Sequence, residues 1–124
     1  DKEKNVSSAL NLAEAYICKK AFPDAEKWAN ESYNMSYTIQ DKIMSKFLLL
    51  TALIIDNKEY TLELKSFIEI FQNSSDFVLR EWTFDELLGC LTDSSISNEK
   101  ADLIKKLVAL LKKEIKPEEF HSAV

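Results

Sequence analysis

Apolar positions recur along this chain at helical spacing, in segments separated by short polar stretches. Within a segment they fall three or four positions apart, which places them on one side of an α-helix. The spacing predicts helices over about 5–20, 60–72 and 98–115, a second helix that opens at Pro23, and a third that ends at Asp56. Pro23 fits a first helical turn because a missing N–H costs nothing there. Residues 117–124 should form a frayed tail.

The third helix differs from the others because it is apolar on almost every side. Its apolar residues occur in all angular sectors between positions 43 and 54, which is typical of a helix covered by several neighbours. We therefore expect this helix to be the centre of the fold. Phe47, Leu50 and Ile54 should be almost fully buried, together with Leu64 and Phe67 of the following helix.

Residues 76–92 allow two interpretations, either one continuous helix or a break near Trp82 followed by a helix. Thr83 and Glu86 form a capping box in front of an apolar run, which favours the break. A similar pair, Thr38 and Asp41, opens the third helix. At the last helix, the N-cap is either position 97 or position 98.

The composition favours an all-α fold. One Gly and two Pro in 124 residues are too few for the Gly-rich turns that sheets require. The hydrophobic content of 46% and the charged content of 30% are ordinary globular values. We expect one domain over residues 1–116, built from three hairpins at about 5–37, 38–73 and 76–115, with a tail over 117–124.

Several features predict a cytoplasmic protein. No apolar run reaches the length of a membrane span, and no secretory leader is visible in the polar first residues. Cys18 and Cys90 have no local partner in the sequence. We expect both thiols to be unpaired, as in a reducing compartment.

The residues that catalysis needs are scarce. His121 is the only histidine and Gly89 the only glycine, which leaves little basis for a catalytic triad, a histidine metal site or a phosphate-binding loop. We interpret His121 as a solvated tail residue and Gly89 as a point of close helix packing. The sequence therefore predicts no enzyme, no cofactor and no metal.

The last helix carries a row of lysines that could suggest an anionic partner. Over Glu99–Lys116, six Lys stand against three acidic residues, a local charge of +3 in a chain of −5. A membrane-surface or nucleic-acid helix is one interpretation. No Arg and no interleaved aromatic residue occur there, which favours a solvated face opposite the apolar stripe. We expect neither nucleic acid nor a membrane as partner.

Residues 12–32 resemble the tetratricopeptide repeat, a helix-turn-helix unit of about 34 residues. The family's Leu, small, Tyr and second-helix Ala positions are occupied by Leu12, Ala13, Tyr16 and Ala25. Ala29 stands where the family often has an aromatic residue, and Trp28 lies one position earlier. We expect Tyr16 and Trp28 to be largely buried between the first two helices.

The resemblance implies antiparallel helical hairpins stacked as a short right-handed superhelix of about six helices. In this family the concave wall comes from the first helix of each hairpin. The wall positions in this chain are Ser7, Leu10, Glu14 and Ile17. Leu10 and Glu14 stand where chaperone-binding members carry a carboxylate clamp, so such a clamp is not expected. Packing against the next hairpin is the alternative role for all four residues.

Two hypotheses of function follow. The first is a protein–protein interaction module that binds a peptide or protein partner, within a larger regulatory or scaffold protein. The second is a structural or oligomerisation domain that forms a homodimer through its terminal helices. In the second case an apolar stripe of the last helix should remain open for a second copy. In the first case that stripe should be covered within the chain, with its lysines facing water.

Overall fold

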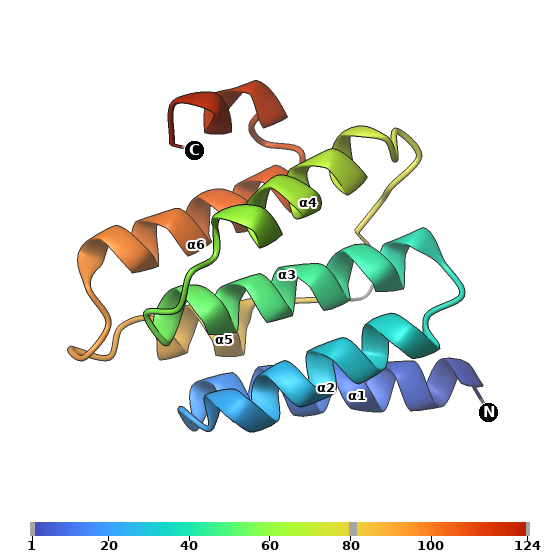
Figure 1. Cartoon of the computed structure of the whole chain (residues 1–124), viewed down its shortest axis with the longest axis horizontal. Coiled ribbons are helices and arrows are strands. Elements are labelled where there is room, and N and C mark those ends of the chain that lie inside the picture. The colour runs from blue at the N-terminus through green and yellow to red at the C-terminus, as the bar shows by residue number, and fades with distance from the viewer. Residues whose placement is uncertain (1, 80–81, 124) are drawn as a thin grey trace. The chain divides into compact units, whose positions relative to one another are not determined.

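The computed structural model describes residues 2–79 and 82–123, and these contain helices but no strand (Figure 1). Its α-helices are α1 (Lys2–Cys18), α2 (Phe22–Met35), α3 (Ile39–Ile55), α4 (Thr61–Gln72), α5 (Asp85–Cys90) and α6 (Asn98–Leu111). A 3-10 helix, η1 (Pro117–Ala123), follows them. The predicted all-α class with about six helices is confirmed. The right-handed superhelix stays a prediction.

The chain forms two compact units. Unit 1 is Asp1–Phe77 and contains α1 to α4, and unit 2 is Val78–Val124 and contains α5, α6 and η1. The division falls between the second and the third expected hairpin. The segment that resembles a repeat therefore lies wholly in unit 1.

Small residues let the first helices of unit 1 approach closely. α1 lies against α2 and α3, and α3 also contacts α2 and α4. Ala9 and Ala13 of α1, and Ala25 and Ala29 of α2, are all buried. A methyl group at each position keeps the two backbones near each other without leaving a void. These buried alanines form the seam between α1 and α2.

α3 forms the core of unit 1, as its pattern predicts. Phe47, Leu50 and Ile54 are buried, and so are Leu64 and Phe67 of α4. Ten of the 17 residues of α3 are buried, more than in any other described helix. Such a helix loses stability with almost any polar substitution, because every sector meets a neighbour.

A row of phenylalanine rings extends this core to the end of unit 1. The rings of Phe47 and Phe67 lie 6.4 Å apart, those of Phe67 and Phe71 also 6.4 Å, and those of Phe71 and Phe77 5.6 Å, edge to face. These separations suit aromatic pairs. Phe77 belongs to a non-helical segment, yet it is fully buried. Its ring therefore anchors the chain that leaves α4.

The segment after α4 decides between the two interpretations of residues 76–92. Positions 77–79 and 82–84 lack helical structure, and α5 begins at Asp85. The continuous helix is therefore wrong, and the break is confirmed. The predicted capping box is also wrong, because the N-cap of α5 is Phe84 and it makes no side-chain hydrogen bond.

Two other predicted caps are present. The Thr38 hydroxyl accepts a hydrogen bond from the Asp41 N–H at 3.2 Å. The Ser97 hydroxyl accepts one from the Lys100 N–H at 3.3 Å, so position 97 is the N-cap of α6. Each bond satisfies a backbone donor that has no partner within the first helical turn.

Three helices end with a non-glycine residue in the left-handed region of the backbone, namely Lys20, Asn57 and Lys113. After α3, the Lys58 N–H donates to the Leu53 carbonyl at 3.0 Å, which is the long bond of a Schellman motif. The same motif ends α6 at Leu111, four residues before the expected end.

The apolar stripe of α6 is buried. Ile104, Leu107 and Leu110 of α6 are fully buried. Of the six lysines in Glu99–Lys116, four are exposed and the other two are half-buried. We expected this arrangement for an interaction module whose last helix is covered within the chain.

The C-terminal segment is ordered into η1, so the expected fraying is wrong. Phe120 is only 1% exposed. The Lys106 ammonium lies 4.8 Å from the centroid of its ring and donates to the Glu119 carbonyl at 2.7 Å. One apolar ring and one lysine thus hold a segment that is otherwise polar.

Candidate functional site

The exposed side of α1 carries an apolar stripe that ends in a lysine. Leu12, Tyr16 and Lys19 are spaced i, i+4 and i+7, so they share one face of the helix. Leu12 is 37% exposed, Tyr16 is half-buried and Lys19 is exposed. Leu12 comes two positions after Leu10, and Tyr16 two positions after Glu14. At 100° per residue, the stripe is therefore rotated by about 200° around α1 from Leu10 and Glu14.

Trp28 extends the same surface onto α2. Glu26 and Tyr33 face α3, because the Lys58 ammonium pairs with Glu26 and the Lys42 ammonium lies over the Tyr33 ring. Trp28 is about 200° around α2 from Glu26, so it points away from α3. We call Leu12, Tyr16 and Trp28 the hairpin face.

Tyr16 and Trp28 were expected to be largely buried. Both have intermediate exposure, so most of each side chain is covered but neither is fully buried. The alanines of both helices are buried in the seam, whereas the partial exposure of both rings places them at its edge.

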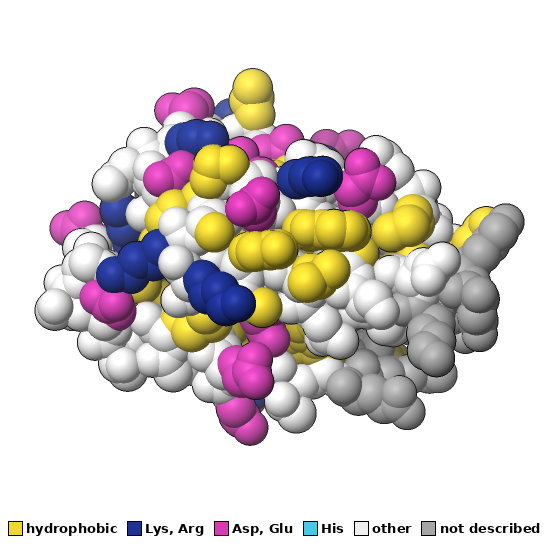
Figure 2. All heavy atoms as spheres, turned by 90° about the horizontal axis from the view of Figure 1, so that it is seen from below, with side chains coloured by type: hydrophobic (Ala, Val, Ile, Leu, Met, Phe, Trp, Pro, Cys, Tyr) yellow, Lys and Arg dark blue, Asp and Glu magenta, His cyan; other side chains and the backbone are white. Residues whose placement is uncertain are grey.

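Figure 2 shows the side of unit 1 that α1 and α2 form, with hydrophobic side chains gathered in a band across it. Charges of both signs border this band. Lys19, Lys20 and Lys27 are exposed near the hairpin turn, and so are Asp24 and Glu31 on α2. The Lys27 ammonium lies 5.6 Å from the centroid of the Trp28 ring. The surface is thus apolar with a mixed, nearly neutral border.

The four wall residues expected from the repeat resemblance divide between surface and core. Ser7 is exposed, whereas Leu10, Glu14 and Ile17 are buried. The structure does not bring these four together on one open surface. Sequence reasoning missed the opposite stripe of Leu12 and Tyr16, although its i, i+4 spacing was visible. It placed Tyr16 between the first two helices and assigned Leu12 no role beyond its match to the family motif.

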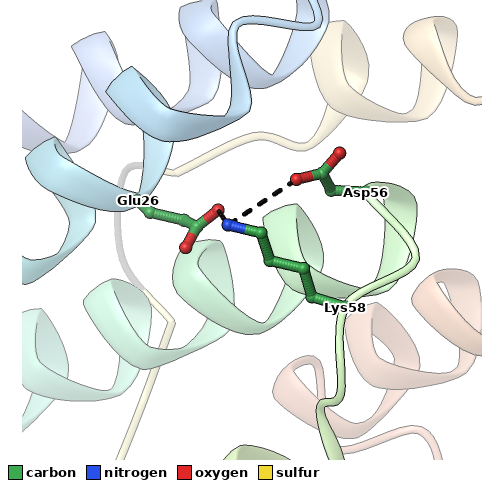
Figure 3. Close-up of polar contacts among 3 residues, drawn as sticks. All are labelled: Glu26, Asp56 and Lys58. Carbon is green, nitrogen blue, oxygen red and sulfur yellow. Dashed lines mark hydrogen bonds and ion pairs between the residues drawn. The ribbon is translucent and has the colours of Figure 1, made fainter.

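A lysine links the end of α3 to α2 (Figure 3). The Lys58 ammonium lies 3.0 Å from a Glu26 carboxylate oxygen and 3.8 Å from an Asp56 oxygen. The hydrogen bond that the Lys58 ammonium donates to Glu26 is the main cause that raises the pKa of Lys58 above its usual value, and the charge of Asp56 adds to it. This arrangement holds a proton firmly, which suits a structural link and not a general base.

A second lysine cluster surrounds Tyr33 at the junction of α2 and α3. The Lys42 and Lys46 ammonium groups lie 4.5 Å and 5.0 Å from the centroid of the Tyr33 ring. Lys46 also pairs with Glu63 of α4 at 3.3 Å. Cation–π contacts and the ion pair together tie three helices. We assign this cluster a structural role in unit 1.

The prediction of unpaired thiols is wrong. Cys18 and Cys90 are both disulfide-bonded, and neither thiol is free. The prediction relied on the lack of a nearby cysteine in the sequence. Sequence separation says nothing about spatial separation, and a disulfide needs only Cα atoms about 4.4–6.8 Å apart.

Gly89 also departs from its expected role. It is exposed, and an added Cβ would meet nothing within 4 Å. Close helix packing is therefore not the reason for glycine at this position. Nothing in the structure explains the choice.

No group of three or more metal-ligating side chains occurs among the described residues. The backbone of His121 belongs to η1, and its side chain lies outside the described residues. No helix within the described ranges has the length and apolar character to cross a membrane. No protein-family model, curated protein or solved structure matches this chain.

Proposed function

We propose that this chain is a protein–protein interaction module that binds a peptide or protein partner on the hairpin face. The observations that carry the proposal are the apolar band over α1 and α2 in Figure 2, the exposure of Leu12 and the partial exposure of Tyr16 and Trp28. Tyr and Trp are enriched in the central contacts of interfaces, because they combine a large apolar surface with a polar group. A tetratricopeptide-like hairpin is a rigid support for such a surface.

The rigid support comes from the helices behind the face. Ala13, Ala25 and Ala29 fix the distance between α1 and α2, and the Glu26–Lys58 pair and the Tyr33 cluster join α2 to α3. The partner then meets preformed side chains, which lowers the entropy lost on binding. We place the module in a larger regulatory or scaffold protein, which supplies the activity that the partner is brought to.

The cysteines support a proposal for the location of the module. A cytoplasmic location was expected on the assumption of free thiols. Disulfide-bonded Cys18 and Cys90 favour an oxidising compartment, because cytosolic reductants keep most thiols reduced. We therefore propose that the partner is met in an oxidising compartment.

Peptide-phage selection tests the interaction. The oxidised chain is the bait, and the variant Leu12→Lys with Trp28→Ser serves for counter-selection. Enriched peptides are synthesised and titrated against protein that carries Trp82→Phe, so that the fluorescence reports Trp28 alone. We expect saturable binding that the double variant loses. The matched control is Leu62→Lys, because Leu62 is an apolar residue of α4 that is 78% exposed.

Two results would contradict this proposal. One is selection that yields no peptide preferring the native chain to the double variant. The other is a selected peptide that loses affinity equally with Leu62→Lys. Circular dichroism of each variant must show native helix content, since Leu12 and Trp28 are partly buried.

Self-association is the second candidate function, and the position of the hairpin face supports it. α1 is a terminal helix, and the charges of both signs around the face allow two copies to pair about a two-fold axis. The alternative surface on α6 is closed, since Leu110 and Leu107 are buried. Light scattering over a concentration series decides. A dimer that dissociates in the Leu12→Lys variant supports this function, and a native chain that is monomeric at all concentrations contradicts it.

A further inference from the structure

Four asparagines of this chain belong to the acceptor sequence for N-linked glycans, Asn followed by any residue except Pro and then by Ser or Thr. They are Asn5, Asn30, Asn34 and Asn73, each with Ser two positions later. Ser and Thr make up 17 of the 124 residues, so chance would supply about one such Ser or Thr among the seven asparagines. The chain has four.

The fold keeps all four asparagines at the surface. Asn5 lies in α1, Asn30 and Asn34 lie in α2, and Asn73 is the C-cap of α4. All four are exposed. A glycan is bulky and hydrated, so it requires a position of this kind. All four asparagines can therefore carry a glycan without disturbing the core of unit 1.

The cysteines provide an independent observation that points to the same modification. Both are disulfide-bonded, and disulfides persist in the oxidising compartments of the secretory route. N-linked glycans are found on secreted proteins at this acceptor sequence. We propose that this protein is N-glycosylated on unit 1, at Asn5, Asn30, Asn34 and Asn73, in an oxidising secretory compartment.

The transfer uses a lipid diphosphate-linked oligosaccharide as co-reactant. The side-chain amide nitrogen of asparagine forms a bond to C1 of the first sugar. The bond between C1 and the diphosphate oxygen breaks, and the lipid diphosphate leaves with that electron pair. The amide nitrogen loses one proton to a base of the transferase. No electron enters or leaves the system, so no oxidant or reductant is needed.

The folded structure implies an order of events for two of the sites. The hydroxyls of Ser32 and Ser36 are buried in helix-to-helix and intrahelical hydrogen bonds, so a transferase cannot reach them in the folded chain. Asn30 and Asn34 must therefore be modified before α2 docks on α3. Ser7 and Ser75 are exposed, so folding does not bury their hydroxyls.

The glycans and the hairpin face occupy different sides of α2. Asn30 and Asn34 are spaced i, i+4 and share one side, and Asn30 lies about 200° around the helix from Trp28. Glycans on α2 leave the Trp28 side open to a partner, whereas Asn5 lies seven positions before Leu12, on the same side of α1. The modification goes beyond the proposed interaction and does not depend on it.

The first test uses the protein isolated from its own cells with antibodies raised against the chain. It is treated with a peptide-N-glycosidase in heavy-oxygen water, which converts each glycosylated asparagine to a heavy-labelled aspartate. We expect the label at all four positions and an increase in electrophoretic mobility. Native protein with no label and no mobility change would overturn the proposal.

The second test maps the acceptor requirement by expression behind a secretory leader in mammalian cells. Asn73→Gln and Ser75→Ala should each remove the same single step from the ladder of partially deglycosylated forms. The matched control is Asn98→Gln, an exposed asparagine with Lys100 two positions later, and it should leave the ladder unchanged. If neither Asn73→Gln nor Ser75→Ala removes a step from the ladder, the assignment of a glycan to Asn73 is contradicted.

A third measurement shows whether the folded form carries the glycans. Non-reducing alkylation separates the disulfide-bonded population, in which no cysteine is labelled, from the population with free thiols. We expect the glycans on the disulfide-bonded population with native helix content. Glycans confined to the population with free thiols would overturn the proposal, because they would mark misfolded chains only.

Discussion

The hydrogen-bonded pair of Ser32 and Ser45 offers a sharp test of how α2 is held on α3. Their hydroxyl oxygens lie 2.7 Å apart, and both residues are fully buried. Ser32 also lies 2.8 Å from the Ala29 carbonyl, and Ser45 2.8 Å from the Asp41 carbonyl. Two hydroxyl hydrogens thus serve three short contacts. One hydroxyl must donate across the helices, and the other donates within its own helix.

The magnitude follows from what each substitution removes. Ser32→Ala or Ser45→Ala deletes the bond between the helices, which contributes about 1 kcal/mol. The remaining hydroxyl still donates to its own carbonyl, so no buried donor is orphaned. Alanine also recovers a few tenths of a kcal/mol of helix propensity at either site. Each single variant should lose roughly 0.5 kcal/mol, and the double variant should be near the native stability.

The assay is a double-mutant cycle by urea unfolding of the oxidised protein, followed by circular dichroism. We expect a coupling energy of about 1 kcal/mol, within the range for residues in direct contact. Ser32→Ala combined with Thr51→Val is the control cycle. The Thr51 hydroxyl is buried but donates to Phe47 within α3, and its cycle should be additive. Additive losses for Ser32 and Ser45, within about 0.3 kcal/mol, would refute the bond between the helices.

Four further predictions concern single positions. Because its folded-state pKa is raised, the Lys58 pair with Glu26 should stabilise the protein fully below the usual lysine pKa of 10.5 and less as the pH rises through the folded-state value. The gap in unfolding midpoint between the native chain and Lys58→Met should close at alkaline pH, and a gap that is constant across this range would contradict the linkage. Trp28→Ala should cost roughly 1–2 kcal/mol, below the 3–5 kcal/mol of a fully buried aromatic, and a larger loss in urea would mean that the ring is buried. Gly89→Ala should stabilise the protein by about 0.5–1 kcal/mol because the added methyl meets open space, whereas a lower melting temperature would indicate a hidden steric need for glycine. Phe120→Ala should lower the free energy of unfolding by roughly 3–5 kcal/mol and raise amide exchange in η1. Unchanged exchange there would contradict the docking of η1 and support the expected frayed tail.

The predictions from sequence succeeded where neighbours along the chain decide the outcome. The helical periodicity, the Thr38 and Ser97 caps and the central place of α3 all rest on residues within a few positions of one another. The all-round apolar pattern of α3 left no sector that could face water, so its burial needed no knowledge of the fold. The predicted capping box at Thr83 was wrong for a local reason as well, because the N-cap of α5 is Phe84, one residue after Thr83.

Tertiary structure decided which of two plausible faces of α1 is covered. Leu10 and Ile17 form one apolar stripe, and Leu12 and Tyr16 form another. Periodicity alone cannot say which stripe meets α3, because both have helical spacing. The alanines of the α1–α2 seam and the long-range contacts with α3 settle it, by burying the first stripe and leaving the second along the outer edge.

The sequence by itself determined the type of structure, because helix formation depends on hydrogen bonds between residues four positions apart and on the scarcity of Gly and Pro. The disulfide bonding of Cys18, the burial of Phe77 and the docking of Phe120 were decided only by the tertiary structure. Each depends on groups that meet only after the chain has folded. The free energy of such contacts comes from buried area and, for the cysteine, from a covalent bond, and neither leaves a periodic signal in the sequence.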